Sequence, residues 1–123
     1  GKGMNEEVDI VICSGYSPGA RVLRMAVRQV AREEKVRMVT VAPALAGLPK
    51  AVEDMKALKD RCVLVVDGCE GFCALQTLNQ FGVKAAKSVM LNKHIQVTQS
   101  AVDMEAANIL KSVREVRAKC GKE

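Results

Sequence analysis

Two cysteines near the middle of the chain, Cys69 and Cys73, have the spacing and the setting that metal binding or thiol chemistry requires. They lie in the stretch DGCEGFCA at residues 67–74, which follows the apolar run CVLVV at residues 62–66. A helical pattern of apolar residues begins at Ala74, so the sequence predicts a buried strand, a turn with one cysteine, and a helix whose first turn carries the second. The positive end of a helix dipole favours thiolate over thiol. Two sulfurs four residues apart can therefore share one metal ion or one redox event.

A third cysteine, Cys13, ends the first β-branched run of the chain, which predicts a buried strand over residues 8–13. Ligands of open α/β sheets bind beyond the carboxyl ends of the strands. If the strand order is the common 2-1-3-4, the first and third strands are neighbours, and Cys13 meets Cys69 and Cys73 at one edge. Zinc prefers tetrahedral nitrogen and sulfur ligands, and three protein ligands leave a fourth position for water or substrate. We therefore predict a zinc site at these three cysteines.

The other candidate residues carry weaker signals. Cys62 begins the third strand, about seven residues at ~3.3 Å each from Cys69, so it is expected at the opposite edge as a small core residue. Cys120 continues the apolar stripe of the last helix, and a core or frayed-tail position is favoured over a ligand role. His94, the only histidine, leaves the same edge as the cysteine cluster and is a fourth ligand, a proton-transfer group or, most simply, a polar surface residue. Tyr16 lies at the same rim.

Strands alternate with helices along the whole chain. Strands are expected at residues 8–13, 36–42, 62–66 and 88–91, with a short fifth strand or strand extension at 95–97, and helices at 18–34, 49–58, 74–82 and 102–120, with a loop at 43–49. Gly82 suits the left-handed end of the third helix, and Asp67 is expected to cap its start. The pattern predicts a three-layer α/β/α sandwich with a Rossmann-like, doubly wound, mainly parallel sheet of four to five strands. One domain over residues 4–123 is expected, with residues 1–3 set aside as an expression remnant.

Composition narrows the classes of partner. Of the 123 residues 49% are hydrophobic and only 2% aromatic, so stacking on nucleic-acid bases is essentially excluded. The net charge of +5 comes from basic residues at helical spacing, such as Arg21, Arg24 and Arg28, which indicates solvated helix faces and no nucleic-acid surface. No apolar run approaches the ~20 residues of a membrane span. With five cysteines and no apolar leader, we expect a reduced, cytoplasmic protein that acts on an unknown small molecule or protein, in an oligomeric state that the sequence leaves open.

Two further hypotheses remain open. In the first, Cys69, Cys73 and Cys13 act without metal in thiol redox or sulfur handling; in the other, the cysteines are incidental to an interaction module. Cys13 and Arg21 also suggest a phosphatase loop, but seven residues separate them where that loop needs five. The sequence is therefore compatible only with phosphate binding at the start of the first helix, without a phosphatase loop.

The motif Asp67-Gly68-Cys69 with Cys73-Ala74, preceded by a strand that ends in Cys13-Ser14-Gly15, resembles the DGC-domain family of small prokaryotic proteins described as zinc-binding. The resemblance runs through the fourth strand and includes Gly47-Leu48-Pro49, which is similar to the family's glycine-rich turn into its second helix. It implies that Cys13, Cys69 and Cys73 are ligand positions. The family's first turn usually reads Cys-Ser-Gly-Cys, and Tyr16 stands here in place of the last cysteine. Three thiolates with water, His94 or Tyr16 in the fourth position, or no metal at all, are the resulting alternatives.

Overall fold

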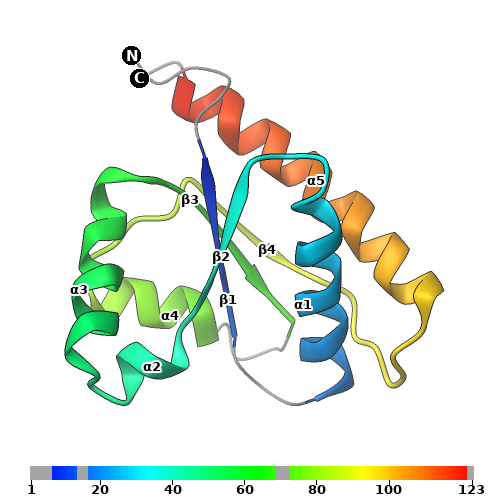
Figure 1. Cartoon of the computed structure of the whole chain (residues 1–123), viewed down its shortest axis with the longest axis horizontal. Coiled ribbons are helices and arrows are strands. Elements are labelled where there is room, and N and C mark those ends of the chain that lie inside the picture. The colour runs from blue at the N-terminus through cyan, green and yellow to red at the C-terminus, as the bar shows by residue number, and fades with distance from the viewer. Residues whose placement is uncertain (1–6, 14–16, 69–72, 122–123) are drawn as a thin grey trace.

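A computed structural model describes residues 7–13, 17–68 and 73–121 (Figure 1). The elements in chain order are β1 (Val8–Ile12), α1 (Pro18–Val30), β2 (Val36–Thr40), α2 (Ala42–Leu45), α3 (Pro49–Ala57) with a 3₁₀ turn (Leu58–Asp60), β3 (Cys62–Asp67), α4 (Cys73–Gln80), β4 (Lys87–Met90) and α5 (Gln99–Gly121). Strands and helices alternate as the sequence predicts.

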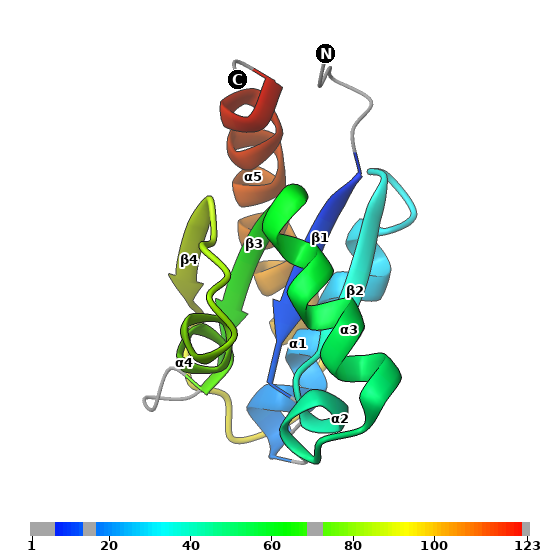
Figure 2. The ribbon, with the colours of Figure 1, turned by 90° about the vertical axis from the view of Figure 1, so that its left-hand side faces the viewer.

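The four strands form one parallel sheet in the order β2-β1-β3-β4. Figure 2 looks at this sheet through one of its helix layers and shows the strands side by side, with all their carboxyl ends at the lower edge. This is the common doubly wound order, the condition under which Cys13 is expected to meet Cys69 and Cys73, and β1 and β3 are neighbours with Ile12 opposite Val66. The chain has the predicted Rossmann-like α/β architecture.

Helices cover both faces of the sheet and bury a core on each side. Figure 1 shows α1 and α5 on one face and α2, α3 and α4 on the other. Ile10 and Leu64 point toward α1 and α5, whereas Val11 and Val65 point the other way and pack with Met55 of α3. Because strand side chains alternate between faces, the mainly apolar strands β1 and β3 supply both cores at once.

The structure differs from the sequence-based expectations at several element ends, in the expected loop at residues 43–49 and at residues 95–97; α1, for example, ends at Val30 and not at residue 34. β2 ends at Thr40, and a short helix, α2, occupies part of the stretch expected to be a loop, where it buries Ala44. No fifth strand forms at residues 95–97 in the described structure: Ile95 is 82% exposed, and Thr98 caps α5 immediately afterwards by accepting the Ala101 N–H at 3.1 Å. Gly82 follows α4 with a φ of 71°, in the left-handed conformation expected of it.

Cys62 and Cys120 form a disulfide at the amino edge of the sheet, where β3 begins and α5 ends. Both residues are buried, as the expectation of core positions requires, but the expectation of unbonded, reduced cysteines was wrong for this pair. The helical stripe that buries Cys120 also carries it to the first residue of β3, with 6.0 Å between the two Cα atoms. Sequence spacing could not reveal this contact, because it depends on how α5 crosses the sheet.

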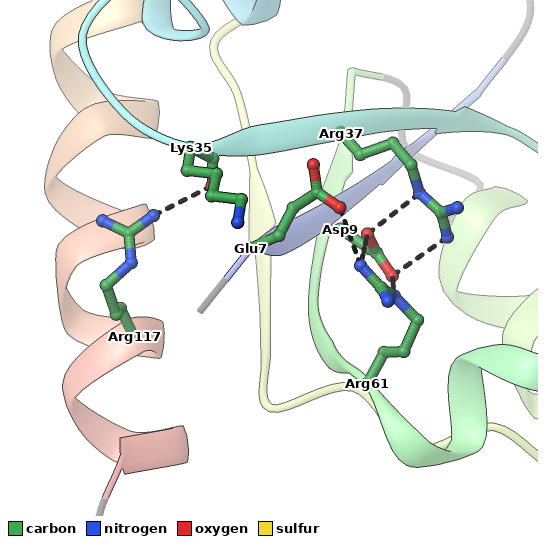
Figure 3. A network of polar contacts seen from close by, with 6 residues as sticks. All are labelled: Glu7, Asp9, Lys35, Arg37, Arg61 and Arg117. Atoms are coloured by element: carbon green, nitrogen blue, oxygen red, sulfur yellow. Dashed lines mark hydrogen bonds and ion pairs between the residues drawn. The ribbon is translucent and has the colours of Figure 1, made fainter. Parts of the chain in front are cut away.

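The same amino edge holds a cluster of charged side chains around one buried carboxylate, drawn in Figure 3. The Asp9 carboxylate is fully buried and accepts hydrogen bonds from Arg37 and Arg61, and Arg61 also reaches Glu7 at 2.8 Å. The hydrogen bond to Asp9 is the main cause that raises the pKa of Arg61. Two guanidinium groups therefore compensate the burial of one carboxylate inside the first strand.

Candidate functional site

Cys13 follows β1 directly at the carboxyl edge of the sheet. The last registered pair of β1 and β3 joins Ile12 to Val66, so Cys13 and Asp67 are the next residues on two neighbouring strands, which run about 4.8 Å apart. Cys13 is partly exposed and is the only free cysteine among those whose side chains the structure describes. A free, partly exposed cysteine thus lies beside the end of the strand that leads into the Asp-Gly-Cys motif.

Asp67 ties the start of α4 back to the end of β3. Its buried carboxylate accepts the N–H of Ala74 at 2.9 Å through Oδ1 and the N–H of Leu75 at 3.3 Å through Oδ2. These are two of the N–H groups that a helix start leaves without intrahelical partners. The predicted capping role of Asp67 is confirmed, and residue 73 begins its helix next to the strand end that precedes Cys69.

The start of α1 lies against the same strand end. A Cβ added to Gly19 would lie 3.6 Å from the carbonyl oxygen of Gly68, and one added to Gly68 would lie 3.7 Å from that of Gly19. These two backbones therefore approach closely, at the residue just before Cys69. The start of α1, with Pro18 in its first turn as predicted, thus borders the Asp-Gly-Cys turn.

A cavity of about 700 Å³ opens beside this contact, between the start of α1 and the segment that follows β4. Its described walls are Ser17, Pro18, Gly19, Gly68, Met90, Leu91, Lys93, His94 and Ile95. The volume is in the range of small-molecule sites, and the cavity lies beyond the carboxyl ends of the strands, where open α/β sheets bind ligands.

His94 is held at this cavity by Glu105 of α5. Its Nε2 lies 2.5 Å from Oε2 of Glu105, a carboxylate that is fully buried. The same oxygen accepts the backbone N–H of Asn92 at 3.2 Å, and the other oxygen accepts from the side chain of Asn108 at 2.9 Å. His94 is therefore an oriented side chain of the cavity wall, with the ring nitrogen Nε2 already engaged.

The structure brings some of the predicted site residues to one edge and leaves others undescribed. Cys13, the backbone of Cys73 and His94 all lie at the carboxyl edge. Cys69 and Tyr16 lie outside the described residues, as does the side chain of Cys73. Within the described ranges no three His, Cys, Asp or Glu side chains gather at a metal-binding distance. The ligand set of three cysteines remains a prediction.

Glu105 and Lys93 are site residues that the sequence reasoning missed. Glu105 lies in the buried stripe of α5 between Val102 and Ile109, at the helical spacing that places apolar side chains in the core. An acidic residue within such a stripe is the available signal, since a buried carboxylate requires partners. Lys93 carries no comparable signal, because an exposed lysine in a loop is common.

Fold and site together define a doubly wound α/β domain with a cavity at the carboxyl edge of its sheet, where β3 ends in the first residue of the Asp-Gly-Cys motif. The family model of the DGC domain matches residues 9–116, and the chain belongs to the DGC domain family. The resemblance found in the Asp67-Gly68-Cys69 motif is thereby confirmed. No curated protein and no solved structure matches the chain.

The described helices include none that is both long enough and apolar enough to cross a membrane. Structural disulfides are commoner in oxidising compartments than in the cytosol, so the Cys62–Cys120 bond gives no support to the predicted cytoplasmic location. That location stays a prediction.

Proposed function

We propose that this DGC-domain protein binds zinc through Cys13, Cys69 and Cys73. The observation that carries the proposal is the pairing of β1 with β3, which makes Cys13 and Asp67 neighbours at the carboxyl edge. The cap from Asp67 to Ala74 supports it further, because it returns the chain to that edge at residue 73.

The donor chemistry fits the metal. Cys13 is a free cysteine in a partly exposed position, and thiolates are among the ligands that zinc prefers. The buried carboxylate of Asp67 is already engaged by two backbone N–H groups and serves to shape the turn. Bound zinc would supply a Lewis acid at this edge, and the three cysteines would hold it with a fourth position for water or a small ligand.

His94 and a solvent molecule are both candidates for the fourth ligand. Nε2 of His94 is bonded to Glu105, and the ring lines the cavity on the side of α1 and α5. A metal-bound histidine commonly donates its second nitrogen to a carboxylate, so Nδ1 would be the coordinating atom if His94 took part.

Zinc content is the measurement that tests the proposal. Protein purified without a metal-affinity column should contain about one zinc per chain, and Cys69→Ala should lose most of it. The matched control is the double variant Cys62→Ser, Cys120→Ser, which removes two cysteines at the opposite edge and should keep the zinc. Equal zinc in Cys69→Ala and the parent protein would contradict the assignment.

A redox or sulfur-handling function at the same cysteines is the second candidate. The free, partly exposed Cys13, next to the end of the strand that precedes Cys69, is the observation that favours it. In that case the purified protein contains no zinc, and its accessible thiols fall in pairs on mild oxidation and return with reductant. Thiol titration of native protein, made alongside the metal analysis, separates the two functions.

A further inference from the structure

The cavity at the carboxyl edge combines an apolar wall with positive groups. Met90 and Leu91 from the end of β4 and Pro18 from α1 contribute apolar surface, and Ile95 stands at the rim with 82% of its surface exposed. A large apolar side chain left this open beside a cavity provides contact area for the body of a bound molecule.

Charge in the described wall of the cavity has a single sign. Lys93 is a cation, and none of the residues that line the described wall is acidic. The Glu105 carboxylate behind His94 is fully buried and already engaged by Asn92, His94 and Asn108. The N-terminal end of α1, a helix of 13 residues, adds the positive end of its dipole. The cavity therefore favours an anionic group over a neutral or cationic one.

The backbone at the start of α1 supplies a hydrogen-bond donor. Pro18 has no N–H, the N–H of Ala20 is bonded to Oγ of Ser17 at 3.2 Å, and the N–H of Arg21 is bonded to the Ser17 carbonyl at 3.0 Å. Among the described contacts of this turn, the N–H of Gly19 has no acceptor, and Gly19 lines the cavity. Backbone donors of this kind bind carboxylates and phosphates at helix starts.

Lys93 lines the cavity between two residues that are both bonded to the buried Glu105. Asn92 through its backbone and His94 through its ring bond to the same oxygen of Glu105, and these two residues flank Lys93. The segment is thus pinned to α5 before any ligand arrives, which lowers the entropy lost on binding. Glu105 is in this sense a positioning residue.

We propose that this cavity is a binding site for a small organic anion with an apolar body, whose acidic group meets Lys93 and the Gly19 N–H while its body packs on Ile95 and Met90. A carboxylate and a phosphate monoester share this chemistry. The inference goes beyond the zinc site, because none of the residues that carry it is a cysteine.

Titration with three small probes, followed by amide NMR shifts, tests the proposal. Hexanoate has the acid and the apolar body, acetate has the acid alone, and hexylammonium has the body with the opposite charge. Hexanoate should shift the amides of Gly19, Gly68 and residues 91–95 saturably, acetate should bind more weakly, and hexylammonium should leave these amides unchanged. Hexyl phosphate in place of hexanoate distinguishes the two acids by their relative affinity.

Variants make the test specific. Lys93→Met should raise the Kd for hexanoate about five- to tenfold, the loss expected for one partly exposed charge-assisted hydrogen bond. Lys56→Met is the matched control, since Lys56 is an exposed lysine of α3, outside the cavity, and the affinity should not change. Glu105→Gln should shift the amide signals of residues 92–94 in the free protein. The same variant should also bind hexanoate with lower affinity.

Several results would overturn the site. These are an equal affinity for hexanoate and hexylammonium, shifts at amides away from the cavity, no saturable binding of hexanoate, or an unchanged affinity in Lys93→Met. Repeating the titration with a chelator present separates this site from the zinc site. An affinity that survives chelation supports the cavity, whereas one lost on chelation would assign the anion to the metal.

Discussion

Cys62 and Cys120, 58 residues apart in the sequence, join the first residue of β3 to the last turn of α5. Their disulfide lies at the amino edge of the sheet, whereas Asp67, the first residue of the Asp-Gly-Cys motif, ends β3 at the carboxyl edge. The chain thus separates a structural pair of cysteines from the candidate site by the length of one strand.

Reduction of this disulfide should destabilise the fold without removing zinc. A bond that closes a loop of this length contributes about 2–4 kcal/mol, mainly by restricting the unfolded chain. Urea unfolding with and without reductant measures the difference. The Cys62→Ser, Cys120→Ser variant should match the reduced protein, and a variant as stable as the oxidised parent would show that the bond adds nothing.

Loss of the Asp67 carboxylate should weaken both α4 and the zinc site. Asp67→Ala removes the acceptor of two backbone N–H groups and should cost about 1–2 kcal/mol of unfolding free energy, with lower zinc content as well. Thr98→Ala is the control, because Thr98 caps α5 in a similar way, at 3.1 Å from the Ala101 nitrogen, and has no part in the cysteine turn. Thermal unfolding should therefore show a similar loss of stability in the two variants. Metal analysis should show less zinc in Asp67→Ala only.

Removal of Arg61 should lower the free energy of unfolding, because the buried Asp9 carboxylate loses one of its two guanidinium partners. Arg61→Met leaves a fully buried carboxylate with Arg37 as its remaining guanidinium partner, and we expect a loss of about 2–3 kcal/mol in urea unfolding. Adding Asp9→Asn removes the charge that needs compensation, so Arg61→Met should cost less in that background. Additive effects of the two changes would show that the cluster is not coupled.

Glu115 should contribute stability that disappears in acid. The hydrogen bond from Lys87 is the main cause that lowers the pKa of this carboxyl from its usual value of 4.5. Because the folded pKa is below the unfolded one, ionised Glu115 stabilises the fold above the unfolded pKa, and this stabilisation is lost as the pH falls through the folded pKa.

Glu115→Gln should therefore lower Tm slightly near neutral pH and leave it unchanged once the pH is below the folded pKa. The effect is small because the Glu115 side chain is exposed. Glu53→Gln on the surface of α3 is the control for a change of one negative charge. A Tm difference for Glu115→Gln that persists in acid would assign the effect to packing.

Local patterns in the sequence were sufficient for the four strands, the four longer helices, the parallel α/β class, the cap at Asp67 and the left-handed Gly82, but not for the short helix α2. These features depend on residues within a turn or two of one another, such as the alternation of apolar and polar positions and the free N–H groups of a helix start. Even the neighbouring position of Cys13 and Asp67 followed from the usual order of doubly wound sheets.

Tertiary structure alone decided the contacts between segments far apart in the chain. The Cys62–Cys120 bond, the two arginines around Asp9 and the hold of Glu105 on Asn92 and His94 each join elements whose relative position depends on how helices cross the sheet. Apolar periodicity states only that Cys120 and Glu105 face the interior. Which side chain each one meets there is determined by the packing of α5 against β3 and the segment after β4.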